Sequence, residues 1–176
     1  MKTPLELRRK TSAMRLATAF FCVLATAGLS GQALAACPQE LAVYSEVDGD
    51  TSIDFRPETE AAIVANSFRL ITREGLMLDG MVMWSDEPAR AYGSLMLNCP
   101  EGDQTGEEIV ACTHWQGVVY ALDKEGTIGL IPPSGEAAAE RLLFPDLARA
   151  LDSGPLNDGK TTLPRWDVYA LSGCQE

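Results

Sequence analysis

The chain has 176 residues, of which 46% are apolar and 22% charged, and its formal net charge is −11. This composition excludes a disordered acidic tail and a collagen-like repeat, and the length fits one globular domain. The first 35 residues hold five basic residues and one acidic residue, so residues 36–176 carry a net charge of −15. A surface this acidic repels phosphate backbones and anionic lipid headgroups, which argues against nucleic-acid binding and charge-driven membrane binding.

The first 35 residues have the pattern of a secretory signal peptide. Basic residues precede an apolar run at 16–29, and the small residues Ala33 and Ala35 lie three and one positions before a cleavage site. The run is shorter than the roughly 20 residues that span a bilayer, and no comparable run follows it. We therefore expect a signal peptide at 1–35 and a single secreted or periplasmic domain at 36–176, with no transmembrane segment in the mature chain.

The cleavage region also resembles a lipoprotein signal, in which Cys37 would be acylated and would anchor the protein. The polar residues Ser30-Gly31-Gln32 separate the apolar run from the cut, as in ordinary signal peptides. Acylation of Cys37 would also leave three cysteines, so that one thiol would have no partner for a disulfide in an oxidising compartment. Soluble secretion is favoured for this reason, with the lipoprotein as the alternative. The four cysteines of the expected mature domain are Cys37, Cys99, Cys112 and Cys174.

Cysteine positions predict the first disulfide. Cys99 and Cys112 flank a short acidic connection, 100–108, between strands expected at 91–98 and 109–122. A bridge between these two cysteines would close a short loop between neighbouring strands.

The second predicted disulfide joins Cys37 to Cys174. Cys37 precedes the apolar segment 41–44, and Cys174 follows the apolar segment 166–171. If these terminal strands pair antiparallel, the start of one meets the end of the other. The bridge would then tie the two ends of the domain together.

The remaining pattern predicts an α+β fold, mainly an antiparallel β-sheet built from hairpins. Gly75 and Gly126 mark two hairpin turns, because glycine adopts the positive φ that tight turns require. Strand 76–84 is apolar on both faces, which is typical of a strand that is covered on both sides. The strands that the two turns join are expected at 67–72, 76–84, 117–122 and 127–131.

One helix is expected to pack on the sheet. Residues 136–152 contain an Ala-Ala-Ala run and follow Ser134, a candidate N-cap. Pro145 lies inside this segment and predicts a kinked or split helix. A shorter helix is expected at 57–65. Core positions are expected for the tryptophans Trp84, Trp115 and Trp166.

The single histidine limits the possible catalytic chemistry. A Ser-His-Asp or Cys-His arrangement would have to use His114, but no Gly-x-Ser-x-Gly turn is present and Cys112 is expected in a disulfide. Glycine-rich phosphate loops and the spacing of zinc ligands are absent as well. We expect His114 to be structural and assign no catalytic residue.

Two metal patterns are possible but compete with simpler explanations. Asp48, Asp50 and Asp54 alternate as at the start of a calcium loop, but Ile53 lies where an EF-hand needs glycine, so a solvated turn is favoured. Thioether and imidazole groups suit Cu(I), although methionine is also a common core residue. The candidate copper ligands are Met77, Met81, Met83, Met96 and His114. The sequence predicts no cofactor.

These observations favour a small, acidic, disulfide-stabilised protein of the bacterial envelope that is not an enzyme. Such a binding or accessory protein would act on an unknown protein or on a small cationic ligand. One alternative is a secreted hydrolase that uses a pair of carboxylates, because the chain offers many acidic residues. The other is a Met/His copper-binding protein.

We predict that the exported chain starts at Ala36 and carries no acyl group. Ala33 and Ala35 supply the small side chains that signal peptidase accepts, and the sulfur of Cys37 is expected in a disulfide. Intact-mass analysis of the exported protein measures both properties. A diacylglycerol on Cys37 would show that the lipoprotein alternative is correct.

Overall fold

The computed structural model describes residues 36–57 and 64–176. The signal peptide expected at 1–35 lies outside the described residues, and so does most of the helix expected at 57–65. Its last two positions, Val64 and Ala65, belong to a strand. Ala35–Glu176 form one compact unit.

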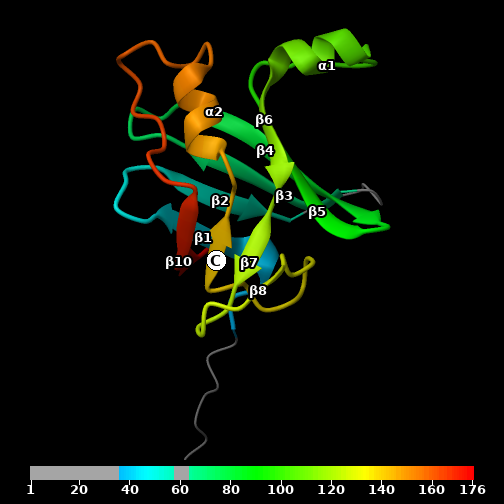
Figure 1. Cartoon of the computed structure of the whole chain (residues 1–176), viewed down its shortest axis with the longest axis vertical. Coiled ribbons are helices and arrows are strands. Elements are labelled where there is room, and N and C mark those ends of the chain that lie inside the picture. Colours follow the sequence, from blue (N-terminus) through cyan, green and yellow to red (C-terminus); the bar gives the residue numbers. More distant parts are fainter. Residues whose placement is uncertain (1–35, 58–63) are drawn as a thin grey trace, which may run out of the picture. The chain divides into compact units, whose positions relative to one another are not determined.

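Within the described residues, ten strands form one sheet, and every neighbouring pair in it is antiparallel (Figure 1). The strand order is β6-β5-β4-β3-β2-β1-β10-β9-β7-β8. The predicted antiparallel sheet is confirmed. The strands are β1 (Ala42–Glu46), β2 (Ser52–Arg56), β3 (Val64–Ile71), β4 (Met77–Asp86), β5 (Ala89–Met96), β6 (Thr113–Val118), β7 (Tyr120–Leu122), β8 (Ile128–Leu130), β9 (Arg141–Leu143) and β10 (Val168–Cys174). The helices are the 3-10 helix η1 (Gln39–Leu41), α1 (Gly106–Cys112) and α2 (Leu147–Ser153).

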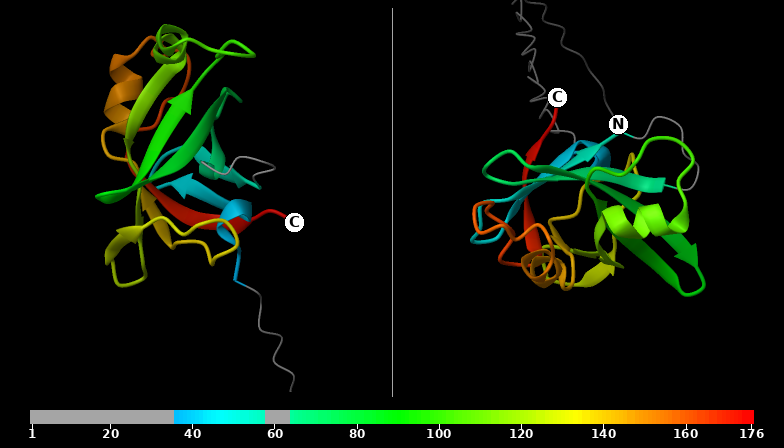
Figure 2. Two further views of the ribbon diagram at one scale, coloured as in Figure 1. Left: turned by 90° about the vertical axis from the view of Figure 1, so that its right-hand side faces the viewer. Right: turned by 90° about the horizontal axis from the view of Figure 1, so that it is seen from above.

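The sheet curls into a half-barrel because one stretch of chain belongs to both of its ends (Figure 2). β6 is the edge strand beside β5, and only Val119 separates it from β7, which lies between β8 and β9 at the other end. Val119 is fully buried, and its N–H donates to the carbonyl oxygen of Ala91 at 2.8 Å. A flat sheet could not contain both pairings, so the curvature follows from this connection.

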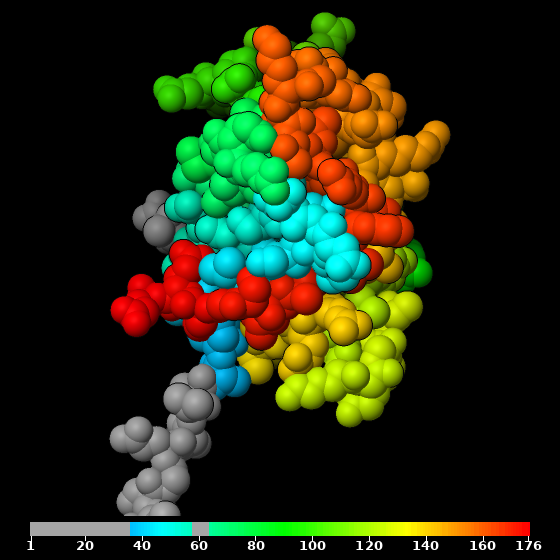
Figure 3. Space-filling view, turned by 90° about the vertical axis from the view of Figure 1, so that its left-hand side faces the viewer, coloured from blue at the N-terminus to red at the C-terminus, as the bar shows by residue number. Residues whose placement is uncertain are grey.

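Both chain ends of the domain are held in the sheet. β10 pairs with β1, with Ala42 opposite Cys174, and the red β10 runs beside the blue N-terminal segment in Figure 3. The disulfide Cys37–Cys174 lies at this junction, with a Cα–Cα distance of 5.7 Å. A loop of this length lowers the entropy of the unfolded chain enough to stabilise the fold by about 5 kcal/mol.

A second disulfide joins Cys99 to Cys112, with a Cα–Cα distance of 5.2 Å. The structure thus contains both bridges in the pairing expected from the sequence. The segment before Cys112 differs from the expected strand at 109–122, because α1 occupies its first positions. Thr105 and Glu108 form a capping box in which the Thr105 N–H donates to Glu108 Oε2 at 2.9 Å and the Glu108 N–H donates to Thr105 Oγ1 at 3.3 Å. The prediction of a strand at 109–122 does not take into account this Thr-x-x-Glu pattern, which is typical of the start of a helix.

The helix expected over 136–152 exists only in its second half, as α2. Residues 136–140 form a loop, and β9 follows it between β10 and β7. Leu142 in β9 is fully buried, and pairing on both sides satisfies the backbone groups of β9. This tertiary pairing overrides the helix propensity of the alanine run. The two oxygens of Asp167 accept from the N–H groups of Asp146 and Ala148 at 2.8 and 2.9 Å, and so fix the start of α2.

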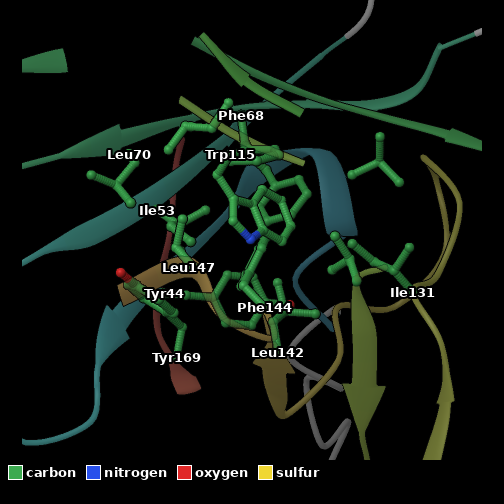
Figure 4. Close-up of a cluster of buried hydrophobic side chains, with 14 of the residues drawn as sticks. Tyr44, Ile53, Phe68, Leu70, Trp115, Ile131, Leu142, Phe144, Leu147 and Tyr169 are labelled. Atoms are coloured by element: carbon green, nitrogen blue, oxygen red, sulfur yellow. The ribbon is translucent and has the colours of Figure 1, made fainter. Parts of the chain in front are cut away.

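The core is a chain of aromatic rings on the concave side of the sheet (Figure 4). Phe144 lies at its centre, with ring centroids 5.7 Å from those of Phe68, Trp115 and Tyr169. The indole of Trp115 lies over Gly117, where a Cβ would come within 2.7 Å of it. Its Nε1–H donates to the carbonyl oxygen of Pro145 at 3.0 Å, which fastens β6 to the segment before α2.

A buried carboxylate attaches the segment before β10 to the sheet. Glu46 is only 5% exposed, and its Oε1 accepts from the N–H groups of Arg165 and Trp166 at 2.5 and 2.9 Å. Its Oε2 accepts from Thr51 Oγ1 at 2.8 Å, and the Thr51 hydroxyl lies 3.0 Å from that of Tyr169. Four donors therefore converge on one carboxylate when the N–H of Thr51, at 3.4 Å, is included.

We predict that Glu46→Gln lowers the free energy of unfolding by about 2 kcal/mol or more, because an amide NH₂ would face donors where an acceptor is required. Urea unfolding measures this loss. Glu125→Gln, at an exposed carboxylate in a hairpin turn, is the matched control and should change stability by less than about 0.5 kcal/mol. Equal stability of the two variants would contradict the structural role of Glu46.

Candidate functional site

A groove opens where the curled sheet fails to close completely. At the closed part, Tyr120 in β7 lies opposite Leu143 in β9. After Leu143 the chain leaves the sheet and turns through Pro145 into α2. β6, which precedes β7 in the chain, therefore pairs with β5 on one side and faces α2 on the other. The space between β6 and α2 is a cavity of about 580 Å³. Its lining includes residues of β6, Pro145, Asp146 and Ala150.

β6 presents unpaired backbone groups to this groove. Trp115 and Gly117 lie opposite Leu95 and Gly93, and the Val119 N–H donates to Ala91. Because hydrogen-bonding positions alternate along an antiparallel ladder, the N–H and C=O groups of the intervening residues point away from β5. These are Gln116 and Val118, whereas His114 lies at the register shift between Leu95 and Met96, where the alternation is interrupted. In the part of the chain that the structure describes, β5 is the one strand that pairs with β6.

The groove has one carboxylate among its described lining residues, that of Asp146. This residue is exposed and has a φ of 61°, in the left-handed region that aspartate and asparagine tolerate best among residues with side chains. Its N–H is held by Asp167. Val110 of α1, also a lining residue, is 74% exposed and adds an apolar surface. The groove therefore combines a strand edge, a negative charge and an apolar wall.

His114 lies in this groove, on β6 immediately after the α1 segment that ends at Cys112. Burial lowers the pKa of the imidazole below its usual value, so His114 is neutral near pH 7. Within the described residues the ring makes no hydrogen bond, whereas a general base needs a group to activate within hydrogen-bond reach. The expectation that His114 is structural stays a prediction.

The candidate copper ligands gather on neighbouring strands without facing one another directly. Met77, Met81 and Met83 alternate with buried residues along β4, and Met96 lies on β5 opposite Asp79. Met81 and Met83 lie opposite Ser94 and Tyr92 instead of another methionine. The nearest cross-strand methionine pairs are therefore diagonal, about 7 to 8 Å apart at Cα. Copper binding stays a prediction.

The candidate calcium ligands are separated by the fold. Asp48 lies in a turn with a φ of 60°, Asp50 forms an ion pair with Arg73 at 2.6 Å, and Asp54 lies within β2. Among the described residues, no group of three His, Cys, Asp or Glu side chains is arranged to hold a metal ion. Calcium binding stays a prediction.

A second cavity, of about 830 Å³, lies between α2 and the segment that precedes β10. Asp152 and Asp167 line it and would be the acidic pair for the hydrolase alternative. Both oxygens of Asp167 already accept backbone N–H groups, and Asp152 Oδ1 accepts from the Asn157 amide at 3.1 Å. Their contacts are those of structural carboxylates. Trp166, expected in the core, lines this cavity and is 57% exposed.

Comparison with protein-family models, curated proteins and solved structures finds no match for this chain. None of the helices in the described ranges is long and apolar enough to cross a membrane. The geometry of the site is therefore the basis for any functional conclusion.

We predict that His114→Gln lowers the free energy of unfolding at pH 7 by about 1 kcal/mol and flattens its pH dependence below about pH 6.5. The folded-state pKa of His114 is lowered, so the unfolded chain binds the proton first as the pH falls. Stability should then decrease as the pH falls through the unfolded pKa, about 6.5, and the glutamine variant lacks this decrease. Urea unfolding at several pH values measures it. A parallel pH profile in both proteins would contradict the burial of the imidazole.

Proposed function

We propose that the protein is an extracytoplasmic binding protein that takes an extended, basic segment of a partner protein onto the open edge of β6. The observation that carries this proposal is the open edge of β6, where the backbone groups of Gln116 and Val118 point away from β5 and border a cavity of about 580 Å³. A strand edge of this kind is a template for another strand.

The dimensions fit a short added strand. Residues 115–118, which keep a regular register, rise about 10 Å along β6, at roughly 3.4 Å per residue. A partner segment of four residues in extended conformation matches this length, and its backbone groups can pair with those of β6. Backbone hydrogen bonds supply affinity in strand addition, while side chains on alternate positions supply specificity.

The charge of the site supports a basic partner. Asp146 lies beside the edge, and residues 36–176 carry a net charge of −15. Such a field accelerates the approach of a positively charged segment and disfavours an acidic one. The exposed side chain of Val110 can pack against an aliphatic side chain of the partner segment that points toward the groove.

The location in this proposal is the periplasm or the exterior of the cell. The two disulfides are compatible with an oxidising compartment. The sulfur of Cys37 is bonded to that of Cys174, and a thioether to a lipid would need the same sulfur. This bond favours secretion over lipid anchoring through Cys37.

We predict that an eight-residue peptide, in which threonine and valine alternate and two positions are replaced by lysine, shifts the backbone amide resonances of Gln116 and Val118. These are the amides that would donate to an added strand, so they should also become protected from hydrogen exchange. The control peptide has proline at the two central positions that would donate to β6, and it should leave these amides unchanged. Shifts confined to other residues, or equal shifts with the proline peptide, would contradict strand addition.

A pair of variants tests the contribution of charge to the same site. Asp146→Asn should weaken binding of the lysine peptide, whereas Asp48→Asn should leave it unchanged. The two aspartates are matched, because both are exposed and have φ angles near 60°, and each substitution removes one negative charge. Asp48 lies in the turn between β1 and β2 and does not line the groove.

A further inference from the structure

Basic side chains gather at one place on this acidic domain. Residues 36–176 contain nine lysine and arginine residues, and three of them line the cavity of about 830 Å³ between α2 and residues 157–167. They are Arg149 on α2 and Lys160 and Arg165 on the following segment. This cavity shares no lining residue with the groove beside β6.

The three charged groups lack counter-ions within the described residues. Arg69, Arg73 and Lys124 form ion pairs elsewhere in the structure, whereas Arg149, Lys160 and Arg165 form none among the residues described.

The nearby carboxylates are already engaged. Asp167 accepts from the N–H groups of Asp146 and Ala148, and Asp158 Oδ1 accepts from the N–H groups of Lys160 and Thr161 at 2.8 and 2.9 Å. Asp152 accepts from the side chain of Asn157. These bonds do not remove the negative charges, so the lining of the cavity carries three positive and two negative charges, a net charge of +1. The carboxylates are bonded to donors of the protein, and the basic groups remain able to meet a ligand.

The segment that carries these cations is fastened to the domain at two points. Glu46 accepts the N–H groups of Arg165 and Trp166. Glu74 accepts the N–H and the hydroxyl of Thr162 at 2.8 and 2.7 Å. Figure 3 shows this orange segment running over the surface beside the cyan turn after β1. A wall held in this way loses little conformational entropy when a ligand binds.

Trp166 adds an aromatic surface to the positive charge. It follows Arg165 in the chain, lines the same cavity and is 57% exposed. Exposed indole next to cations suits a ligand that has both a flat ring and an anionic group. We propose that this cavity binds a small organic anion, a ring that bears a carboxylate or a phosphate monoester.

The surrounding charge limits the size of the ligand. Outside the cavity the domain is strongly acidic, and electrostatic interactions reach about 8 Å at physiological ionic strength. A small anion can therefore lie within the field of the three cations. A polyanion would extend onto the acidic surface and be repelled.

Titration with four probes tests this proposal by nuclear magnetic resonance of the mature domain. Phenyl phosphate and benzoate carry both a ring and a charge, inorganic phosphate lacks the ring, and benzyl alcohol lacks the charge. Phenyl phosphate should shift the indole N–H of Trp166 and the amides of residues 148–167 with a Kd of about 1 mM or lower. Benzoate should bind more weakly, and the other two probes should bind at least about tenfold more weakly than phenyl phosphate.

A matched pair of variants separates the cavity from the overall charge. The triple variant Arg149→Gln, Lys160→Gln, Arg165→Gln should weaken phenyl phosphate binding by about tenfold or more. The triple variant Arg56→Gln, Arg90→Gln, Arg141→Gln makes the same change in net charge at arginines outside the cavity and should bind as the unsubstituted domain does. Thermal unfolding verifies that both variants are folded.

Three outcomes would overturn the proposal. The first is the absence of shifts in residues 148–167 with phenyl phosphate, and the second is an equal loss of binding in the two triple variants. The third is equal affinity for phenyl phosphate and benzyl alcohol, which would show that charge has no part. Equal affinity for inorganic phosphate would overturn the role given to Trp166.

Discussion

The structure depends on the passage of one continuous stretch of chain, β6, Val119 and β7, from one end of the sheet to the other. Val119 is buried and hydrogen-bonded to Ala91, so the stretch is fixed at its midpoint. Because β6 pairs with β5 and β7 pairs with β9, the sheet must curl until its ends meet. The curl creates the enclosed space that the aromatic core fills, with Phe144 at its centre. The same geometry leaves β6 without a second partner strand among the described residues, because the chain after β9 turns away into α2.

Buried and half-buried carboxylates then attach the outer segments to this curled sheet. Glu46 and Asp167 together accept six hydrogen bonds, and five of their donors are backbone N–H groups. Hydrogen bonds to a charged acceptor are stronger than those to a neutral one. This added strength offsets the free-energy cost of removing the carboxylates from water. These acids hold α2 and the segment before β10 in place. The cavity of about 830 Å³ borders both elements, and the groove beside β6 borders α2.

The two surfaces differ in charge and in the kind of ligand that each suits. Beside β6, a strand edge and the carboxylate of Asp146 favour an extended basic segment. On the other side of α2, three cations and Trp166 favour a small anion with a ring. Arg149, which lines the second cavity, and Ala150, which lines the first, are neighbours on α2. The helix thus separates a negative site from a positive one, and ligands of one class are disfavoured at the other.

The sequence by itself determined those features that depend on local pattern or on counting. Alternating apolar residues and the glycine turns at Gly75 and Gly126 indicate antiparallel hairpins. The positions of the four cysteines indicate one short-range disulfide and one disulfide that joins the two ends of the domain. Only the tertiary structure decided that 141–143 is a strand, because sheet neighbours on both sides stabilise it against the local preference for helix. It also decided which strand edge stays open and that Arg149, Lys160 and Arg165 share one cavity. These properties depend on which residues meet across the fold, and spacing along the chain does not specify such contacts.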